Sequence, residues 1–180
     1  MKTGLLFHLA ALGFASVPVV SAGQVAQAQQ AVTTYHNNPL RTGLNDHEAL
    51  LKPSNVNKSS FGKLFTQPVD GQVYGQPLYV PRLSIAGGVH NVVFIVTEHD
   101  SVYAFDADHG QAALWHVSFL DPSRGITTVS QDDVGHCGQI KPEIGITDTP
   151  VIDLSTNTLY LVAMTKRVSG GTAFFEHTLH

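Results

Sequence analysis

The chain has 180 residues, a formal net charge of -4 at pH 7 and only 13% charged residues. That balance offers no basic surface for a polyanion, so nucleic acid is excluded as an expected partner. The single cysteine, Cys137, cannot form a disulfide within the chain. It is therefore either a free thiol or paired with a partner outside this sequence.

The first 28 residues have the order of features found in a secretory signal peptide. Lys2 gives a positive start, Leu5–Phe14 form the apolar stretch, and Ala26-Gln27-Ala28 provides small residues for cleavage. The apolar stretch is too short for a membrane span. We therefore expect residues 1–28 to be removed, with Gly23 as the second choice of mature N-terminus. The expected location is secreted or periplasmic, with no membrane partner after cleavage.

Residues 29–60 form an N-terminal segment that precedes the strand patterns. Its polar run Tyr35–Asn45 contains His36 and Arg41, which are candidate ligand contacts. The alternative, which we favour, is an ordered segment that leads into the first repeat and carries no chemistry of its own.

From residue 61 onward the chain consists of short β-branched and aromatic runs separated by Gly, Pro, Asn and Asp, which predicts strands and turns. The strand pattern occurs once in full and then begins again. The expected strands lie at 76–80, 91–97, 101–106 and 114–117, and then at 149–153, 158–163 and from 174 onward. Recurrence of such a four-strand unit is typical of a propeller blade.

A turn is predicted at Asp106-Ala107-Asp108-His109-Gly110. Aspartate side chains cap backbone amides in turns, and glycine tolerates a positive φ. The same run is also the start of a calcium-loop pattern, but the later acidic ligand of such a loop does not follow. We therefore favour the turn.

These residues resemble the pyrroloquinoline quinone (PQQ) type propeller repeat, in the quinoprotein alcohol dehydrogenase-like superfamily. The resemblance lies in Pro77–Val80, Val93–Val96, Val102–Asp106 with Gly110, and Trp115. It implies an all-β fold, a β-propeller of four-stranded blades. A closed propeller has about four to eight blades. Residues 61–180 provide two to three, so we expect an incomplete propeller, truncated at its C-terminal side.

The insertion between about residues 120 and 144 holds the candidate functional residues, because long propeller connections are frequent ligand sites. His136 and Cys137 with a nearby carboxylate would form a metal site or an activated thiol. Neighbouring residues of an extended chain point in opposite directions, however, and the ten histidines show no zinc-type spacing. We therefore expect no metal site.

The resemblance also indicates which residues would contact a PQQ cofactor. In quinoprotein alcohol dehydrogenases a vicinal cysteine pair packs on the quinone, and the corresponding place here reads His136-Cys137, with one sulfur. A carboxylate that contacts the cofactor in methanol-type enzymes is replaced here by Tyr74. The candidate cofactor-binding residues are therefore Tyr74, His136, Cys137 and Glu143, and the departures argue against tight PQQ binding.

Two functions remain open. The first is an exported propeller that acts as a binding or scaffold module for a small-molecule, glycan or protein ligand, without chemistry of its own. The alternative is the N-terminal part of a quinoprotein oxidoreductase that passes electrons from an alcohol or sugar to PQQ, with calcium. A glycosidase using Asp132, Asp133 and Glu143 has only carboxylate content in its favour. Whether the chain is an enzyme stays undecided at this point.

Overall fold

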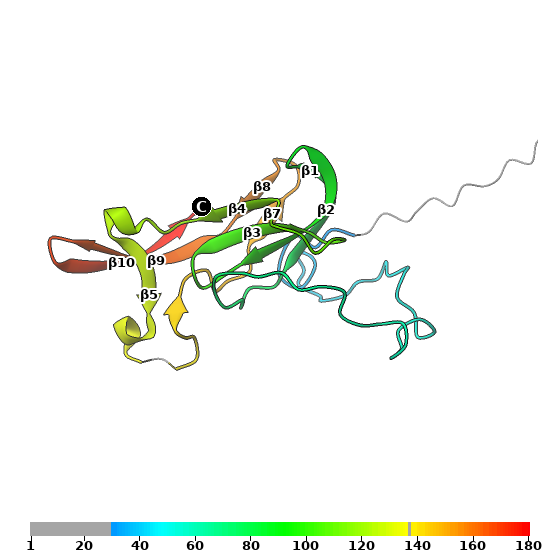
Figure 1. Ribbon diagram of the computed structural model, residues 1–180, viewed down its shortest axis with the longest axis horizontal. Coiled ribbons are helices and arrows are strands. Elements are labelled where there is room, and N and C mark those ends of the chain that lie inside the picture. Colours follow the sequence, from blue (N-terminus) through cyan, green and yellow to red (C-terminus); the bar gives the residue numbers. More distant parts are fainter. Residues whose placement is uncertain (1–29, 137) are drawn as a thin grey trace, which may run out of the picture.

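A computed structural model describes residues 30–136 and 138–180. The predicted signal peptide, residues 1–28, and the candidate Cys137 lie outside these described residues. The described chain is mostly β, as the sequence predicts, and contains ten strands and two short 3₁₀ helices, η1 (Pro122–Arg124) and η2 (Gln131–Val134). The strands form small antiparallel sheets, and none of these sheets closes on itself (Figure 1).

The first sheet contains the four strands of the first pass in sequence order. They are β1 (Leu78–Ile85), β2 (Gly88–Val96), β3 (Ser101–Asp106) and β4 (Trp115–Ser118), paired antiparallel as β1-β2-β3-β4. The register places Leu78 opposite Phe94, Phe94 opposite Ala104 and Ala104 opposite Trp115. Directly opposed residues share a face, so these four side chains form one row across the sheet.

The second pass differs from its prediction. Residues 158–163 were expected to form one strand, but the structure divides them between β8 (Thr158–Tyr160) and β9 (Val162–Ser169). β8 pairs with β7 (Val151–Asp153), whereas β9 pairs with β10 (Thr172–Leu179). Leu161, between β8 and β9, exchanges two backbone hydrogen bonds with His180, at 3.2 and 2.9 Å. The residues of the expected single strand therefore belong to two strands that pair with different neighbours.

The predicted insertion also contains strands that the sequence analysis missed. These are β5 (Ile126–Ser130) and β6 (Glu143–Ile144), which complete a four-stranded sheet of order β10-β9-β5-β6. β5 pairs with β9 through Ile126 opposite Arg167 and Thr128 opposite Thr165. The β9–β10 hairpin extends from the body of the molecule beside β5 (Figure 1).

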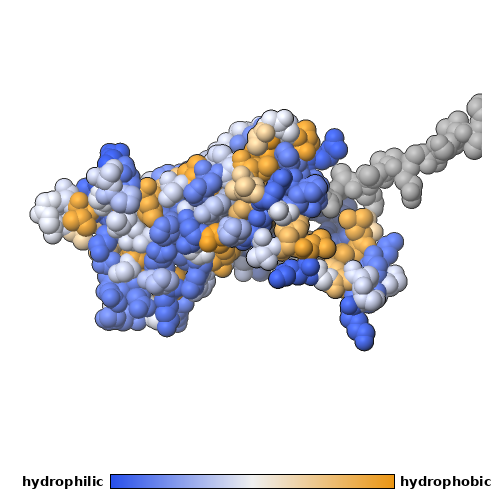
Figure 2. Space-filling view, in the orientation of Figure 1, coloured by the Kyte–Doolittle hydropathy of each residue, from blue (hydrophilic) through white to orange (hydrophobic). Residues whose placement is uncertain are grey.

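The N-terminal segment contacts both the first sheet and the β7–β8 hairpin. Val32 forms an antiparallel bridge with Tyr79 of β1, and the carbonyl of Thr33 accepts a hydrogen bond from the Ile152 N–H of β7 at 2.8 Å. Farther along, the segment lies at the surface, with Leu40 85% and Leu64 89% exposed. Figure 2 shows apolar side chains at the end of the molecule that carries this segment.

Two small groups of buried apolar side chains form the core. One contains Leu78, Val80 and Ile152, and the other contains Val96, Val102, Ile146, Leu161 and Ala163. The second group joins the end of the β2–β3 hairpin to β9 and to Ile146. The two sheets therefore meet at the tip of this hairpin, and the polar groups around that tip define the first candidate site.

Candidate functional site

The four residues proposed from the sequence have different surroundings. Tyr74 is half-exposed, and its hydroxyl donates to the carbonyl of Gln139 at 3.1 Å. Glu143 begins β6 and lies 2.9 Å from Nδ1 of His99. His136 is exposed and has a left-handed backbone conformation with a φ of 60°, and its Nδ1 lies 3.1 Å from Oδ1 of Asp132. Among the described residues, Tyr74, His136 and Glu143 form no hydrogen bond or ion pair with one another.

The three carboxylates of the glycosidase hypothesis also have separate structural partners. Asp132 pairs with His136, and Glu143 pairs with His99. Asp133 completes the capping box of η2 by accepting from the N–H of the N-cap residue Ser130, and its Oδ1 lies 2.7 Å from Nζ of Lys166. The hydrogen bond from Lys166 lowers the pKa of Asp133 to about 2, with a further contribution from Ser130. Each of these three side chains therefore has a partner of its own, and the structure does not bring the three together.

The tip of the β2–β3 hairpin is a polar cluster that the sequence analysis missed. It spans Thr97–Ser101, and all of its side chains except that of His99 are buried. Asp70 anchors it by accepting hydrogen bonds from the hydroxyls of Thr97 at 2.9 Å and Ser101 at 2.5 Å. Four of five consecutive polar side chains are thus enclosed, although short hairpin tips usually lie at the surface.

Three segments of the chain meet at this tip, and we call them together the junction: residues 70–74, 97–101 and 143–147. The Glu98 N–H donates to the carbonyl of Gln72 at 2.9 Å, and the Ile146 N–H donates to the carbonyl of Thr97 at 3.2 Å. Tyr74 and Glu143 belong to the outer two segments. The structure therefore brings these two candidates into one region, although their polar groups have different partners.

Glu98 and Asp100 are the buried acids of the junction, 1% and 0% exposed. One oxygen of Glu98, Oε2, accepts from the Gly145 N–H at 2.8 Å and from the Thr147 hydroxyl at 3.0 Å. Burial raises the pKa of Glu98 above its usual range, against the effect of these two hydrogen bonds. Burial likewise raises the pKa of Asp100 to about 8, and the nearby charges of Glu98 and Glu143 add to this rise.

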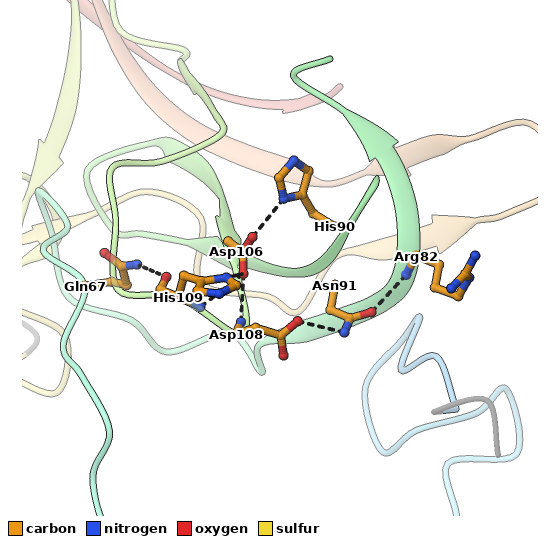
Figure 3. A network of polar contacts seen from close by, with 7 residues as sticks. All are labelled: Gln67, Arg82, His90, Asn91, Asp106, Asp108 and His109. Atoms are coloured by element: carbon orange, nitrogen blue, oxygen red, sulfur yellow. Dashed lines mark hydrogen bonds and ion pairs between the residues drawn. The ribbon is translucent and has the colours of Figure 1, made fainter. Parts of the chain in front are cut away.

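A second polar cluster surrounds Asp106 at the end of β3 (Figure 3). Its carboxylate accepts from Nδ1 of His90 at 2.8 Å, from Nδ1 of His109 at 3.1 Å, and from the backbone N–H of Asp108 at 2.8 Å. The hydrogen bond from His90 is the main reason that the pKa of Asp106 falls to about 2. The backbone contacts confirm the predicted turn.

The sequence analysis attributed Gly110 to a need for positive φ in this turn, and that explanation is wrong. Gly110 does not have a positive φ. A Cβ at this position would instead lie 2.8 Å from Cβ of Phe65, which is too close for any side chain. Space, and not backbone conformation, therefore requires glycine at the end of this turn.

The surface beside Asp106 is hollowed. The hollow has a volume of about 510 Å³, and its lining includes Arg82, His90, Asn91, Asp108 and His109. Asn91 connects two of its sides, because it donates to Asp108 at 2.8 Å and accepts from the Arg82 N–H at 3.1 Å. The hollow therefore presents both hydrogen-bond donors and hydrogen-bond acceptors to solvent, and its lining includes basic and acidic side chains.

An apolar groove lies between the first sheet and the β7–β8 hairpin. It has a volume of about 890 Å³, and Leu83, Phe94, Trp115, Ile152 and Leu159 are among its lining residues. Its walls are mainly hydrocarbon, in contrast to the hollow beside Asp106.

Residues 30–136 and 138–180 contain no group of three or more His, Cys, Asp or Glu side chains arranged to hold a metal ion. Within the same residues, no helix is long and apolar enough to cross a membrane. Comparisons with protein-family models, curated proteins and solved structures find no match to this chain.

Proposed function

We propose that this chain is an exported protein built from PQQ-like propeller blades and that it acts as a binding or scaffold module. The observation that carries the proposal is the first sheet. Its four strands follow one another in sequence order and pair antiparallel, and the aspartate turn of the repeat connects β3 to β4. These are the features of a propeller blade.

The contact between the two passes of the repeat gives further support. The Gln76 N–H, just before β1, donates to the hydroxyl of Thr149, just before β7, at 2.8 Å. These residues hold equivalent positions in the two passes, before Pro77 and Pro150. Adjacent blades of a propeller place their equivalent strands side by side around a common axis, so this contact is the one that two neighbouring blades would make.

The hollow beside Asp106 is the surface that we assign to ligand binding. Arg82, Asn91, Asp108 and His109 present both donors and acceptors there, and a few convergent polar groups in a concavity are typical of small-molecule sites. A polar ligand such as an oligosaccharide suits this lining better than an apolar one. Among the described residues, the guanidinium of Arg82 forms no ion pair, so it is free to contact such a ligand.

Binding of the mature chain to an array of neutral and acidic oligosaccharides tests this assignment. We expect Arg82→Ala to weaken binding of any glycan that the wild type retains by about tenfold, the size of a lost charge-assisted hydrogen bond. Arg124→Ala is the matched control, because Arg124 is exposed in η1 and does not line the hollow. Equal binding by wild type and Arg82→Ala would overturn the assignment.

The alternative function, a quinoprotein oxidoreductase, is favoured by one observation: Tyr74 and Glu143 lie in the same junction. The residues present nevertheless fit PQQ poorly. The Tyr74 hydroxyl is engaged by the carbonyl of Gln139, and the Glu143 carboxylate is engaged by His99. We therefore expect no saturable signal when the chain is titrated with PQQ, with or without calcium. A stoichiometric signal that Glu143→Gln abolishes would favour the oxidoreductase.

A further inference from the structure

The buried acids Glu98 and Asp100 are not explained by ligand binding in the surface hollow. Within the described residues, Oε1 of Glu98 and both oxygens of Asp100 are buried without a hydrogen-bond partner of good geometry, although the backbone N–H of Met164 lies close enough to Asp100 to lower its pKa against the effect of burial. An ionised carboxylate in this state is costly, because it loses its hydration and gains little in return. Something must therefore reduce the negative charge at this place.

The two carboxyl groups approach each other around Gly145. Its N–H donates to Glu98 at 2.8 Å. A Cβ at position 145 would lie 2.9 Å from the carboxyl carbon of Asp100 and 2.4 Å from the carbonyl oxygen of Glu98. The carboxyl group of Asp100 and the backbone carbonyl of Glu98 thus occupy the space that a side chain at position 145 would need. The carboxyl group of Glu98 is close enough to raise the pKa of Asp100 through its charge.

The groups that face this pair do not neutralise it. Glu143 and Asp148 add negative charge, and Asp70 lies on the other side of the tip, bonded to Thr97 and Ser101. The imidazole of His99 is directed to Glu143. His180 stacks on Phe119, whose N–H donates to the backbone carbonyl of Asp100.

Lysine and arginine do not pair with either acid within residues 30–136 and 138–180. Among the described residues, neither Glu98 nor Asp100 forms an ion pair, and Lys166 of β9 is bonded to Asp133 instead. The same part of the chain offers no third ligand for a metal ion. A proton is the remaining way to reduce the charge, and it needs no additional space.

We propose that Glu98 and Asp100 hold one proton between them in the folded protein, and that loss of this proton loosens the junction between the β2–β3 hairpin and residues 143–147. The inference does not depend on the proposed function. Deprotonation releases the proton from a carboxyl oxygen to solvent and leaves two adjacent buried carboxylates. Their repulsion acts on the hydrogen bonds that join Glu98 to Gly145 and Thr147.

The direction of the pH effect follows from the folded and unfolded states. The pKa of Asp100 is raised from 3.8 to about 8 in the folded protein. The stabilising effect of the bound proton is therefore complete below pH 3.8, declines as the pH rises, and is lost above about pH 8. At pH 7 the protonated form still exceeds the ionised form by about ten to one.

Infrared spectroscopy of the mature chain detects the proton directly. We expect a protonated carboxyl band at pH 7 that disappears by pH 9 and that Asp100→Asn lacks. Glu98→Gln removes a neighbouring negative charge and should move the disappearance of the band to lower pH. Absence of the band in the folded wild type at pH 7, or a band that Glu98→Gln does not shift, would overturn the proposal.

Amide hydrogen exchange of the peptide covering residues 143–147 measures the loosening. Asp100→Asn keeps the size of the side chain and cannot ionise. We expect this peptide to exchange several-fold faster in the wild type than in Asp100→Asn at pH 9, and at similar rates in the two proteins at pH 5. The exposed Asp46→Asn is the matched control. The same ratio at both pH values would mean that Asp100 has only a packing role.

Discussion

The first sheet and the β9–β10 hairpin differ in how their strands are covered. In β3, five of six residues are buried, because β2 and β4 pair with both edges and Ile146 covers the tip. In β10, seven of eight residues are exposed, and one edge of the strand has no partner strand in the part of the chain that the structure describes. The comparison shows that a strand pattern alone does not produce a core. The surrounding segments must also cover it.

The largest expected effect of this difference is self-association of the mature chain. The exposed edge of β10 and the side chains of Phe174 and Phe175, 43% and 45% exposed, form a template for pairing with another chain. We expect oligomers in sedimentation velocity at micromolar concentration. Phe175→Lys should reduce them, because a charge on an edge strand opposes pairing. Leu44→Lys, on another exposed segment, is the control, and equal reduction by both variants would contradict this account.

One leucine in the first sheet and one in the β9–β10 hairpin allow a direct comparison of the two regions. Leu78 of β1 is 0% exposed and Leu179 of β10 is 69% exposed. Leu78→Ala should lower the free energy of unfolding by about 2–5 kcal/mol, through lost burial and the cavity that remains. Leu179→Ala should change it by less than about 0.5 kcal/mol. Urea unfolding followed by the fluorescence of Trp115 measures both, and similar losses would show that β10 is covered in solution.

A smaller effect is expected where the two regions meet. Gly145→Ala would place a methyl group 2.4 Å from the carbonyl oxygen of Glu98, so the backbone must move. We expect a loss of about 1–3 kcal/mol, typical of overpacking. Gly138→Ala is the control, because a Cβ at that position meets no atom within 4 Å. Thermal unfolding compares the two, and equal stability would mean that the junction is open in solution.

The smallest effect is expected at Asp106. Its pKa is about 2 in the folded protein and 3.8 ordinarily, so its contribution to stability is present above pH 3.8 and is lost as the pH falls towards 2. Asp106→Asn should therefore melt at a lower temperature than the wild type at pH 5, with a smaller difference near pH 2. A difference that does not change with pH would assign the effect to the shape of the turn.

The parts of the fold that the sequence predicts are those made by neighbouring strands. The strands β1–β4 and the Asp106 turn depend on residues close together in the chain, so alternation and turn chemistry are sufficient to predict them. β5 was missed because its partner, β9, follows it by more than thirty residues. β6, which pairs only with β5 among the described strands, has just two residues and gives no strand pattern of its own. The division of residues 158–163 likewise depends on His180, which the local pattern does not contain.

The candidate site was predicted less well, for a similar reason. Tyr74 and Glu143 do reach one region, but His136 stays exposed and Cys137 lies outside the described residues. Glu98 and Asp100 fall between the expected strands 91–97 and 101–106 and were not singled out, because the residues that bury them, among them Gly145, lie far along the chain. One signal was available: in a chain with 13% charged residues, Glu98-His99-Asp100 places three ionisable groups directly between two apolar strands.

The bridge formed by Val32 has a consequence for labelling this protein. Ala31, next to that bridge, and His180 both line the apolar groove between the first sheet and the β7–β8 hairpin. Fluorophores attached at positions 31 and 180 would therefore both lie at this groove. Energy transfer between them would respond to any change in their separation, and neither position lies in a strand.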